Sequence, residues 1–235
     1  MTAPGRWSAP HAPAWADVLC WMETTDAIMR GLGHALSNRI LAVSSTIEAL
    51  DPAQAPGEET CTALSAELQR LTGELRALRA LPVHAAEAPL PVLLKDVAAT
   101  AIALHAHHPT LGDVTVTLTG SDETPPVLVV EPLLVHAMLV TLTALKAFAA
   151  PGGEVRLEYA GTPAEAQLTL SATRDPGRAG DVAALPAMPG GDLPMALLSG
   201  AGMQVEQVVG RGRSAVVWAL PSLREARRRA REATT

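Results

Sequence analysis

The stretch GLGHALSNRI at residues 31–40 carries a histidine, His34, and an asparagine, Asn38, four positions later. Residues four apart share one face of an α-helix, so Asp26, Arg30, His34 and Asn38 would form one polar stripe. An imidazole at such a position can pack in a core, ligate a metal or accept a phosphoryl group. Most of the function that this sequence predicts depends on which of these roles His34 has.

Two glycines, Gly31 and Gly33, lie beside the histidine. A glycine within a helix costs about 1 kcal/mol relative to alanine, so two of them here predict that another group approaches the helix closely. Leu32 and Leu36 lie on the apolar side of the same helix, which predicts that His34 points away from the core.

An outward imidazole with small neighbours suits a phosphoacceptor, because a partner's acidic, metal-bearing pocket can reach one of its ring nitrogens. Arg30 would then favour the arriving negative charge, and Asn38 would orient a water or the phosphoryl oxygens. On local sequence alone, an ordinary solvated histidine on an amphipathic helix remains an alternative.

A metal site is a weaker alternative. HALSN has no second histidine at helical spacing, and His105, His107 and His108 stand in an AHAHHP turn that is typical of a solvated loop. The two cysteines, Cys20 and Cys61, are far apart and form no CxxC motif, so we expect no metal and a reduced, cytoplasmic protein.

Two helices must hold His34 in place. The N-terminal residues 1–22, rich in proline and alanine, predict an irregular arm, and Thr24 offers an N-cap oxygen for a first helix. Prolines and a glycine break the chain at 51–60. Apolar residues recur at spacings of three and four on both sides of that turn: Met29, Leu32, Leu36, Ile40, Val43, Ile47 and Leu50, then Leu64, Leu68, Leu71, Leu75, Leu78 and Leu81.

This pattern predicts an antiparallel helical hairpin over residues 23–82. A lone hairpin buries only part of its apolar surface, so we expect a homodimer in which two hairpins form a four-helix bundle.

After a linker predicted at 83–91, the pattern changes to mixed α/β over 92–221, which makes the expected fold class α+β. The tail 222–235 is charged, and we expect a helix or a frayed end there. Helices are predicted over 91–108, 131–148 and 193–200, and strands over 114–120, 126–130, 154–160, 166–173, 203–209 and 214–221.

Composition excludes some partners. A net charge of −6 argues against a general nucleic-acid binder, and the basic run REARRRAR at 224–231 is short. The N-terminus lacks the pattern of a secretory signal, and the longest apolar run, 132–145, is shorter than the ~20 residues of a membrane-spanning helix. We expect neither a nucleic-acid nor a membrane partner.

Taken together, residues 24–221 resemble the core of bacterial two-component histidine kinases, in which a dimerising hairpin with a phosphorylatable histidine precedes an ATP-binding α/β sandwich. GLGHALSNRI resembles the histidine box of that family, with His34 at the phosphoacceptor place. The end GAGMQVEQVVGRGRSAVVWALP resembles its closing signature, through Gly200, Gly202, Gly210, Gly212, Leu220 and Pro221.

The residues that handle ATP in that family are poorly matched. The helix after Glu131 carries asparagines in the family, one of them a Mg²⁺ ligand, and here Thr141 and Leu145 stand at those places. The acidic residue that follows the phosphoacceptor and serves as a base in active kinases is Ala35.

The glycine-rich boxes differ as well. The adenine box keeps Asp175 and Gly177 but ends in Ala179, and the later box keeps Gly190 but has Asp192 and Pro194 where glycines are expected. A carboxylate repels polyphosphate and a proline removes a backbone donor. The nucleotide boxes are therefore vestigial by this comparison, and we expect no stably bound cofactor.

The combination resembles the dimeric histidine phosphotransferases, relatives of the kinases with a degenerate ATPase-like domain. The resemblance implies relay of a phosphoryl group between the aspartates of response-regulator receiver domains through His34, with Mg²⁺ supplied by the receiver. Two alternatives stay open. A divergent kinase requires ATP binding, and a non-catalytic dimeric scaffold is favoured if His34 is buried against the second helix.

Overall fold

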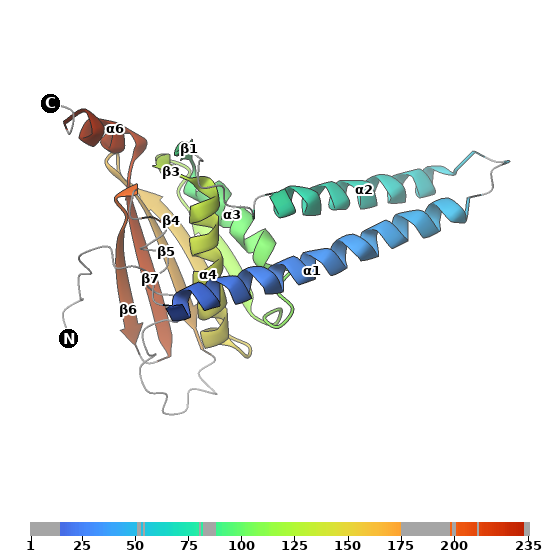
Figure 1. Cartoon of the computed structure of the whole chain (residues 1–235), viewed down its shortest axis with the longest axis horizontal. Coiled ribbons are helices and arrows are strands. Elements are labelled where there is room, and N and C mark those ends of the chain that lie inside the picture. The colour runs from blue at the N-terminus through green and yellow to red at the C-terminus, as the bar shows by residue number, and fades with distance from the viewer. Residues whose placement is uncertain are drawn as a thin grey trace.

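A computed structural model describes residues 15–50, 53, 55–79, 81, 88–174, 198, 201–210 and 212–232. Two long antiparallel helices, α1 (Trp15–Glu48) and α2 (Glu58–Arg79), form a hairpin whose tip extends far from the rest of the chain (Figure 1). The predicted hairpin is therefore present. The predicted irregular arm is wrong for residues 15–22, because α1 begins at Trp15 rather than at Thr24.

The first half of α1 is helical because it packs on another element. Ile28 and Leu32 are fully buried in the core that α4 (Glu131–Ala149) also enters, and Thr24 is buried instead of capping the helix. Helix stability in proteins comes mostly from such tertiary packing. The first half of α1 thus packs in the core of the α/β domain, and its second half packs against α2 in the hairpin.

The apolar stripe of the hairpin divides into two sets. Leucine and valine positions seven apart are half-buried between the helices: Leu36, Val43 and Leu50 with Leu64, Leu71 and Leu78. The positions between them, Ile40 and Ile47 on α1 and Leu68 and Leu75 on α2, are exposed. The sequence predicted a single apolar stripe on each helix. In the structure, one side of this stripe packs against the other helix of the hairpin and the other side is uncovered.

A polar bridge joins the two helices beside this stripe. The Arg39 guanidinium donates to Glu67 at 3.0 Å and to Glu74 at 3.3 Å, from α1 to two successive turns of α2. The side chains of all three residues are largely shielded from solvent, which makes such a network more effective than an isolated surface pair. The bridge favours one register of the two helices.

Five described strands form one mixed sheet in the order β2-β4-β5-β7-β6. Only β2 and β4 run parallel, and the other neighbours are antiparallel. The strands are β2 (Thr115–Gly120), β4 (Glu154–Gly161), β5 (Glu165–Thr173), β6 (Gln204–Gly210) and β7 (Arg213–Pro221).

One face of this sheet is covered by helices. Alternate residues of β4 and β5, such as Val155, Leu157, Leu168 and Leu170, are fully buried under α4, as period-two strands require. The other helix of this layer is α3 (Leu94–His105), which packs beside α4 and on β2 (Figure 1).

Three smaller elements complete the described chain. A separate antiparallel pair is formed by β1 (Leu90–Val92) and β3 (Val127–Val129). The charged tail forms α6 (Leu223–Glu232), which packs against β3.

The predicted α+β class, with a helical hairpin followed by an α/β domain, is confirmed. The strand β1 is absent from the prediction, since three residues that include a proline carry no alternation signal. The helix predicted at 193–200 lies outside the described residues except for Leu198, which is buried.

The apolar helix α4 is long and hydrophobic enough to cross a membrane by length and composition, with a mean hydropathy of 1.6. Its apolar character extends beyond the run 132–145 considered above. However, 72% of this stretch is buried inside the folded domain, so core packing accounts for its composition.

Two buried histidines predict how stability depends on pH. His105 on α3 is paired with the Thr143 hydroxyl of α4 at 3.0 Å, and burial, together with the nearby charge of Lys146, lowers the pKa of His105 from 6.5 to about 3. Burial also lowers the pKa of His136 on α4. The unfolded chain therefore binds protons more readily than the folded chain below about pH 6.5.

We expect the free energy of unfolding to fall as the pH falls from 7.5 to 5, by about 2 kcal/mol from His105 alone. Urea unfolding at a series of pH values measures this slope. A His105→Gln variant removes that titration and should give a flatter profile. A variant profile as steep as that of the parent protein would contradict the assignment.

Candidate functional site

His34 lies where α1 leaves the α/β domain and becomes part of the hairpin. Leu32, two residues earlier, is fully buried in the domain core, and Leu36, two residues later, is half-buried in the hairpin. Between them His34 is exposed and, among the described residues, makes no hydrogen bond or ion pair. The expected outward orientation is confirmed, whereas the role as phosphoacceptor stays a prediction.

The polar stripe around His34 is only partly assembled. Arg30 pairs with Asp26 at 3.1 Å, on the side away from His34, and both side chains are well exposed. Such an exposed pair is worth little energy and can exchange partners readily. Asn38 is exposed one turn after His34, so its predicted supporting role also stays a prediction.

The two glycines beside His34 have different surroundings. A β-carbon on Gly31 would lie 1.8 Å from the carbonyl oxygen of His107, whereas one on Gly33 would meet nothing within 4 Å. The close approach inferred from the glycines is therefore real at Gly31, but it is made by the loop after α3 of the same chain. Gly33 instead leaves the helix surface open next to His34.

The three histidines of the AHAHHP turn have separate environments. His105 is buried on Thr143, and His108 stacks on the His105 ring at a centroid distance of 5.3 Å. Burial lowers the pKa of His108 as well, which favours the neutral ring. His107 instead lies against α1, so the turn does not bring its imidazoles to one point. In the described part of the chain no group of three or more His, Cys, Asp or Glu side chains could hold a metal ion.

The two α4 positions that the kinase family fills with asparagine are committed to the core. The buried Thr141 hydroxyl donates to the Ala137 carbonyl at 2.9 Å, and Leu145 is fully buried. Neither side chain presents an oxygen to a ligand at the surface. The nucleotide-box residues Asp175, Gly177 and Gly190 lie outside the described residues.

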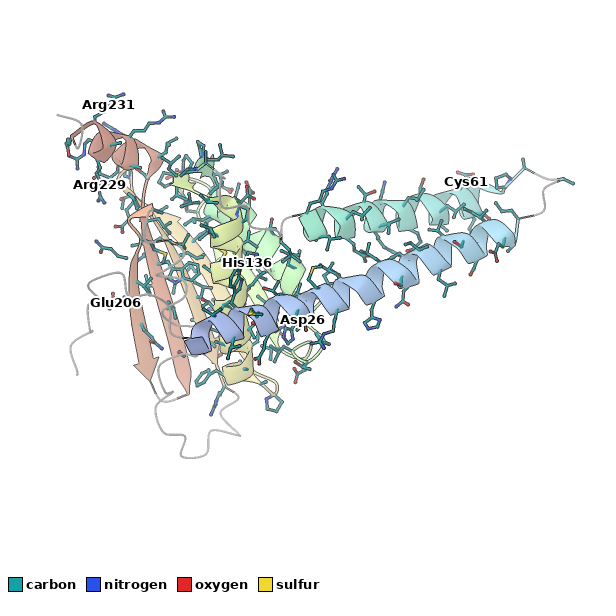
Figure 2. All side chains as sticks on the ribbon, in the orientation of Figure 1. Asp26, Cys61, His136, Glu206, Arg229 and Arg231 are labelled. Carbon is teal, nitrogen blue, oxygen red and sulfur yellow. The ribbon has the colours of Figure 1, made fainter. Side chains whose placement is uncertain are left out.

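A buried histidine on α4 forms a junction that the sequence analysis missed. The Trp21 indole N–H of α1 donates to His136 Nδ1 at 2.8 Å, and His136 Nε2 lies 2.6 Å from the Leu81 carbonyl, just after α2. Figure 2 shows His136 on α4, where α1 passes. An indole only donates and a carbonyl only accepts, so the proton of the neutral ring is on Nε2. The signal was a histidine inside the apolar run PLLVHAMLV at 132–140, since a buried imidazole requires partners.

This junction, which we call the His136 clasp (Trp21, His136 and Leu81), joins both ends of the hairpin to the α/β domain. The Trp21 and His136 rings also meet edge to face at a centroid distance of 5.4 Å. The clasp and the buried Ile28 and Leu32 hold α1 against α4 and so set where His34 is displayed.

The glycine pair offers a matched test of how α1 contacts the loop. Gly31→Ala should destabilise the protein by about 1–3 kcal/mol, because the new methyl group must displace the His107 carbonyl. Gly33→Ala should stabilise it by up to about 1 kcal/mol, since alanine favours the helix and the space is open. Urea unfolding measures both, and equal effects of the two substitutions would contradict this packing.

No model of a known protein family matches the sequence. No curated protein matches it either.

Solved structures do resemble the chain in fold. The catalytic domain of the histidine kinase ThkA is 5% identical, with a TM-score of 0.48, over 58% of this chain and 98% of that one. The same kinase in complex with the response regulator TrrA is 8% identical, with a TM-score of 0.47, over 82% of this chain and 60% of that one. A bacterial phosphotransferase is 14% identical, with a TM-score of 0.40, over 90% of this chain and all of that one. These likenesses concern the path of the chain, and at TM-scores below 0.5 they assign no role to any residue.

Proposed function

We propose that this chain is a histidine phosphotransferase that relays a phosphoryl group between receiver-domain aspartates through His34. The observation that carries this proposal is the exposed, unpartnered imidazole of His34 at the point where α1 leaves the α/β domain, within the described part of the chain. Burial of His34 against α2 would have favoured the alternative of a non-catalytic scaffold, and the ring is exposed.

The surroundings of His34 suit a reaction in which a partner protein supplies the phosphoryl donor and the metal ion. A receiver would supply the aspartyl phosphate and its Mg²⁺, and a ring nitrogen of His34 would attack the phosphorus while the carboxylate leaves. Gly33 has nothing within 4 Å of its missing side chain, and Ala35 is small, so a concave acidic pocket can approach the ring. The protein then contributes an accessible nucleophile at a defined place.

The packing of α4 supports relay without ATP. With Leu145 buried and the Thr141 hydroxyl bonded to the helix backbone, neither side chain would ligate the Mg²⁺ of a bound nucleotide. Ala35 offers no carboxylate to act as base in autophosphorylation. We therefore propose that phosphate reaches His34 from a receiver domain and not from ATP.

The uncovered face of the hairpin supports a homodimer. Ile40 and Ile47 on α1 and Leu68 and Leu75 on α2 are exposed although they are large and apolar. They follow the spacing of a helical-bundle seam, and a second hairpin would cover them by forming four helices. The proposed assembly is thus a dimer with two His34 sites.

The transfer is tested by incubating the protein with a receiver domain carrying radiolabelled aspartyl phosphate and Mg²⁺. The expected result is label on the wild-type chain and none on His34→Ala, since the nitrogen nucleophile is gone. His108→Ala, which removes a half-buried imidazole of the loop after α3, should still accept label.

Radiolabelled ATP with Mg²⁺ should label none of the three proteins in the absence of a receiver. Label on His34→Ala from the phosphorylated receiver would rule out His34 as the acceptor. Labelling of the wild-type chain by ATP alone would favour the kinase alternative.

The dimer is tested with two leucines of similar exposure. Leu68 on the hairpin is 50% exposed and Leu90 on β1 is 60% exposed. Leu68→Asp should convert the dimer to a monomer, because each buried leucine contributes about 1.5–3 kcal/mol and a carboxylate cannot be buried there unpaired. Leu90→Asp should leave the dimer intact. Light scattering after size-exclusion chromatography measures both, and a monomeric parent protein would refute this assembly.

A further inference from the structure

The loop after α3 is held firmly against the phosphoacceptor helix. The chain turns directly after α3, with the His107 N–H donating to the Leu104 carbonyl at 3.1 Å and the His108 N–H to the His105 carbonyl at 2.9 Å. The His107 carbonyl then lies on Gly31 of α1, at a distance that leaves no room for a side chain on that residue. The position of His107 relative to α1 is therefore fixed by the backbone on both sides of the contact.

This contact limits how far the β-carbon of His107 can lie from that of His34. A β-carbon added to Gly31 would lie 3.3 Å from the β-carbon of His107, and β-carbons three positions apart on a helix are about 5–6 Å apart. The β-carbons of His107 and His34 can therefore be no more than about 9 Å apart. Two imidazoles on β-carbons this close can approach one phosphoryl group from two sides.

The two histidines of the loop differ in what else they do. His108 stacks on the buried His105 ring and contacts the Thr110 hydroxyl at 3.3 Å, so its ring already has two partners. His107 is only half-buried, and its side chain has no hydrogen bond or ion pair within the described part of the chain. The imidazole of His107 is thus available where that of His108 is not.

We propose that His107 is a second functional residue of this site, one that donates a ring N–H to the phosphoryl group carried by His34. The inference rests on the proposed function, because it concerns the group that His34 receives. Under this proposal, the loop after α3 supplies a hydrogen-bond donor to the phosphoryl group. The polar stripe of α1 and the nucleotide boxes were not expected to supply this donor.

The step involves no covalent change at His107. A lone pair of one His34 ring nitrogen forms the N–P bond, the P–O bond to the receiver aspartate breaks, and the carboxylate leaves with that electron pair. The phosphoryl oxygens keep their negative charge, and the N–H of His107 binds one of them. Hydrogen bonds to a charged group are stronger than neutral ones, and a donor already in place costs no rearrangement during transfer.

Transfer kinetics test this role with the full-length protein and a phosphorylated receiver. His107→Ala should lower kcat for transfer about 10-fold, the loss of one charged hydrogen bond, and leave KM for the receiver unchanged. His107→Gln should recover most of the rate, because its amide also donates an N–H. His108→Ala, the neighbouring control, should transfer at the wild-type rate.

A purely structural role of His107 would make the Gln and Ala variants equally slow or raise KM. The fold itself should survive, since the contact with Gly31 is made by the backbone carbonyl, and circular dichroism checks this. A His107→Ala variant with wild-type kcat would overturn the proposal while leaving His34 as the acceptor.

A second measurement does not depend on any receiver. Phosphoramidate, a small phosphoryl donor, is used to phosphorylate His34 in protein labelled with ¹⁵N-histidine, and the ring resonances are followed by NMR. The expected result is a shift of the His107 ring resonances and none for His108. Unshifted His107 resonances would overturn the inference. Shifted resonances combined with no transfer from any receiver would instead overturn the relay and keep the contact.

Discussion

The docking of α1 on α4 is the interaction on which the rest of the structure depends. The His136 clasp closes it with two hydrogen bonds, and Ile28 and Leu32 bury their side chains beside it. Because the ring nitrogens of His136 face a donor on one side and an acceptor on the other, a single neutral tautomer satisfies both partners. The clasp holds the start of α1 and the end of α2 on the same helix, so the hairpin is attached to the α/β domain at both of its ends.

This attachment determines what His34 can do. The ring lies two residues beyond Leu32, the last fully buried position of α1, and one turn beyond Gly31, where the loop after α3 contacts the helix. A partner that reaches His34 therefore meets the hairpin and the loop of the α/β domain together. Under the proposed function, relay and hairpin pairing use different parts of the hairpin, since exposed apolar residues such as Ile47 and Leu68 lie further toward its tip than His34.

The sequence predicted the kinds of element well and their contacts poorly. Periodicity identified both helices of the hairpin and the strands of the sheet, because period and burial are linked within each element. It could not show that Thr24 is buried rather than a cap, or that Leu32 belongs to the domain core and Ile40 to an open face, since both follow from which element packs on which. The exposure of His34 was predictable from its leucine neighbours, whereas the approach of His107 was not, because it joins residues far apart in the chain.

The packing of α4 shows what the α/β domain contributes to the position of α1. Thr141 and Leu145 face inward, and α4 is the central support of the core. That same helix carries His136 and receives Ile28 from α1. Without it, the first half of α1 would lose its apolar cover, and a helix of this kind depends on such packing for its stability. Under the proposed function, the domain works by holding the phosphoacceptor helix straight and in place, which requires a rigid core and no nucleotide.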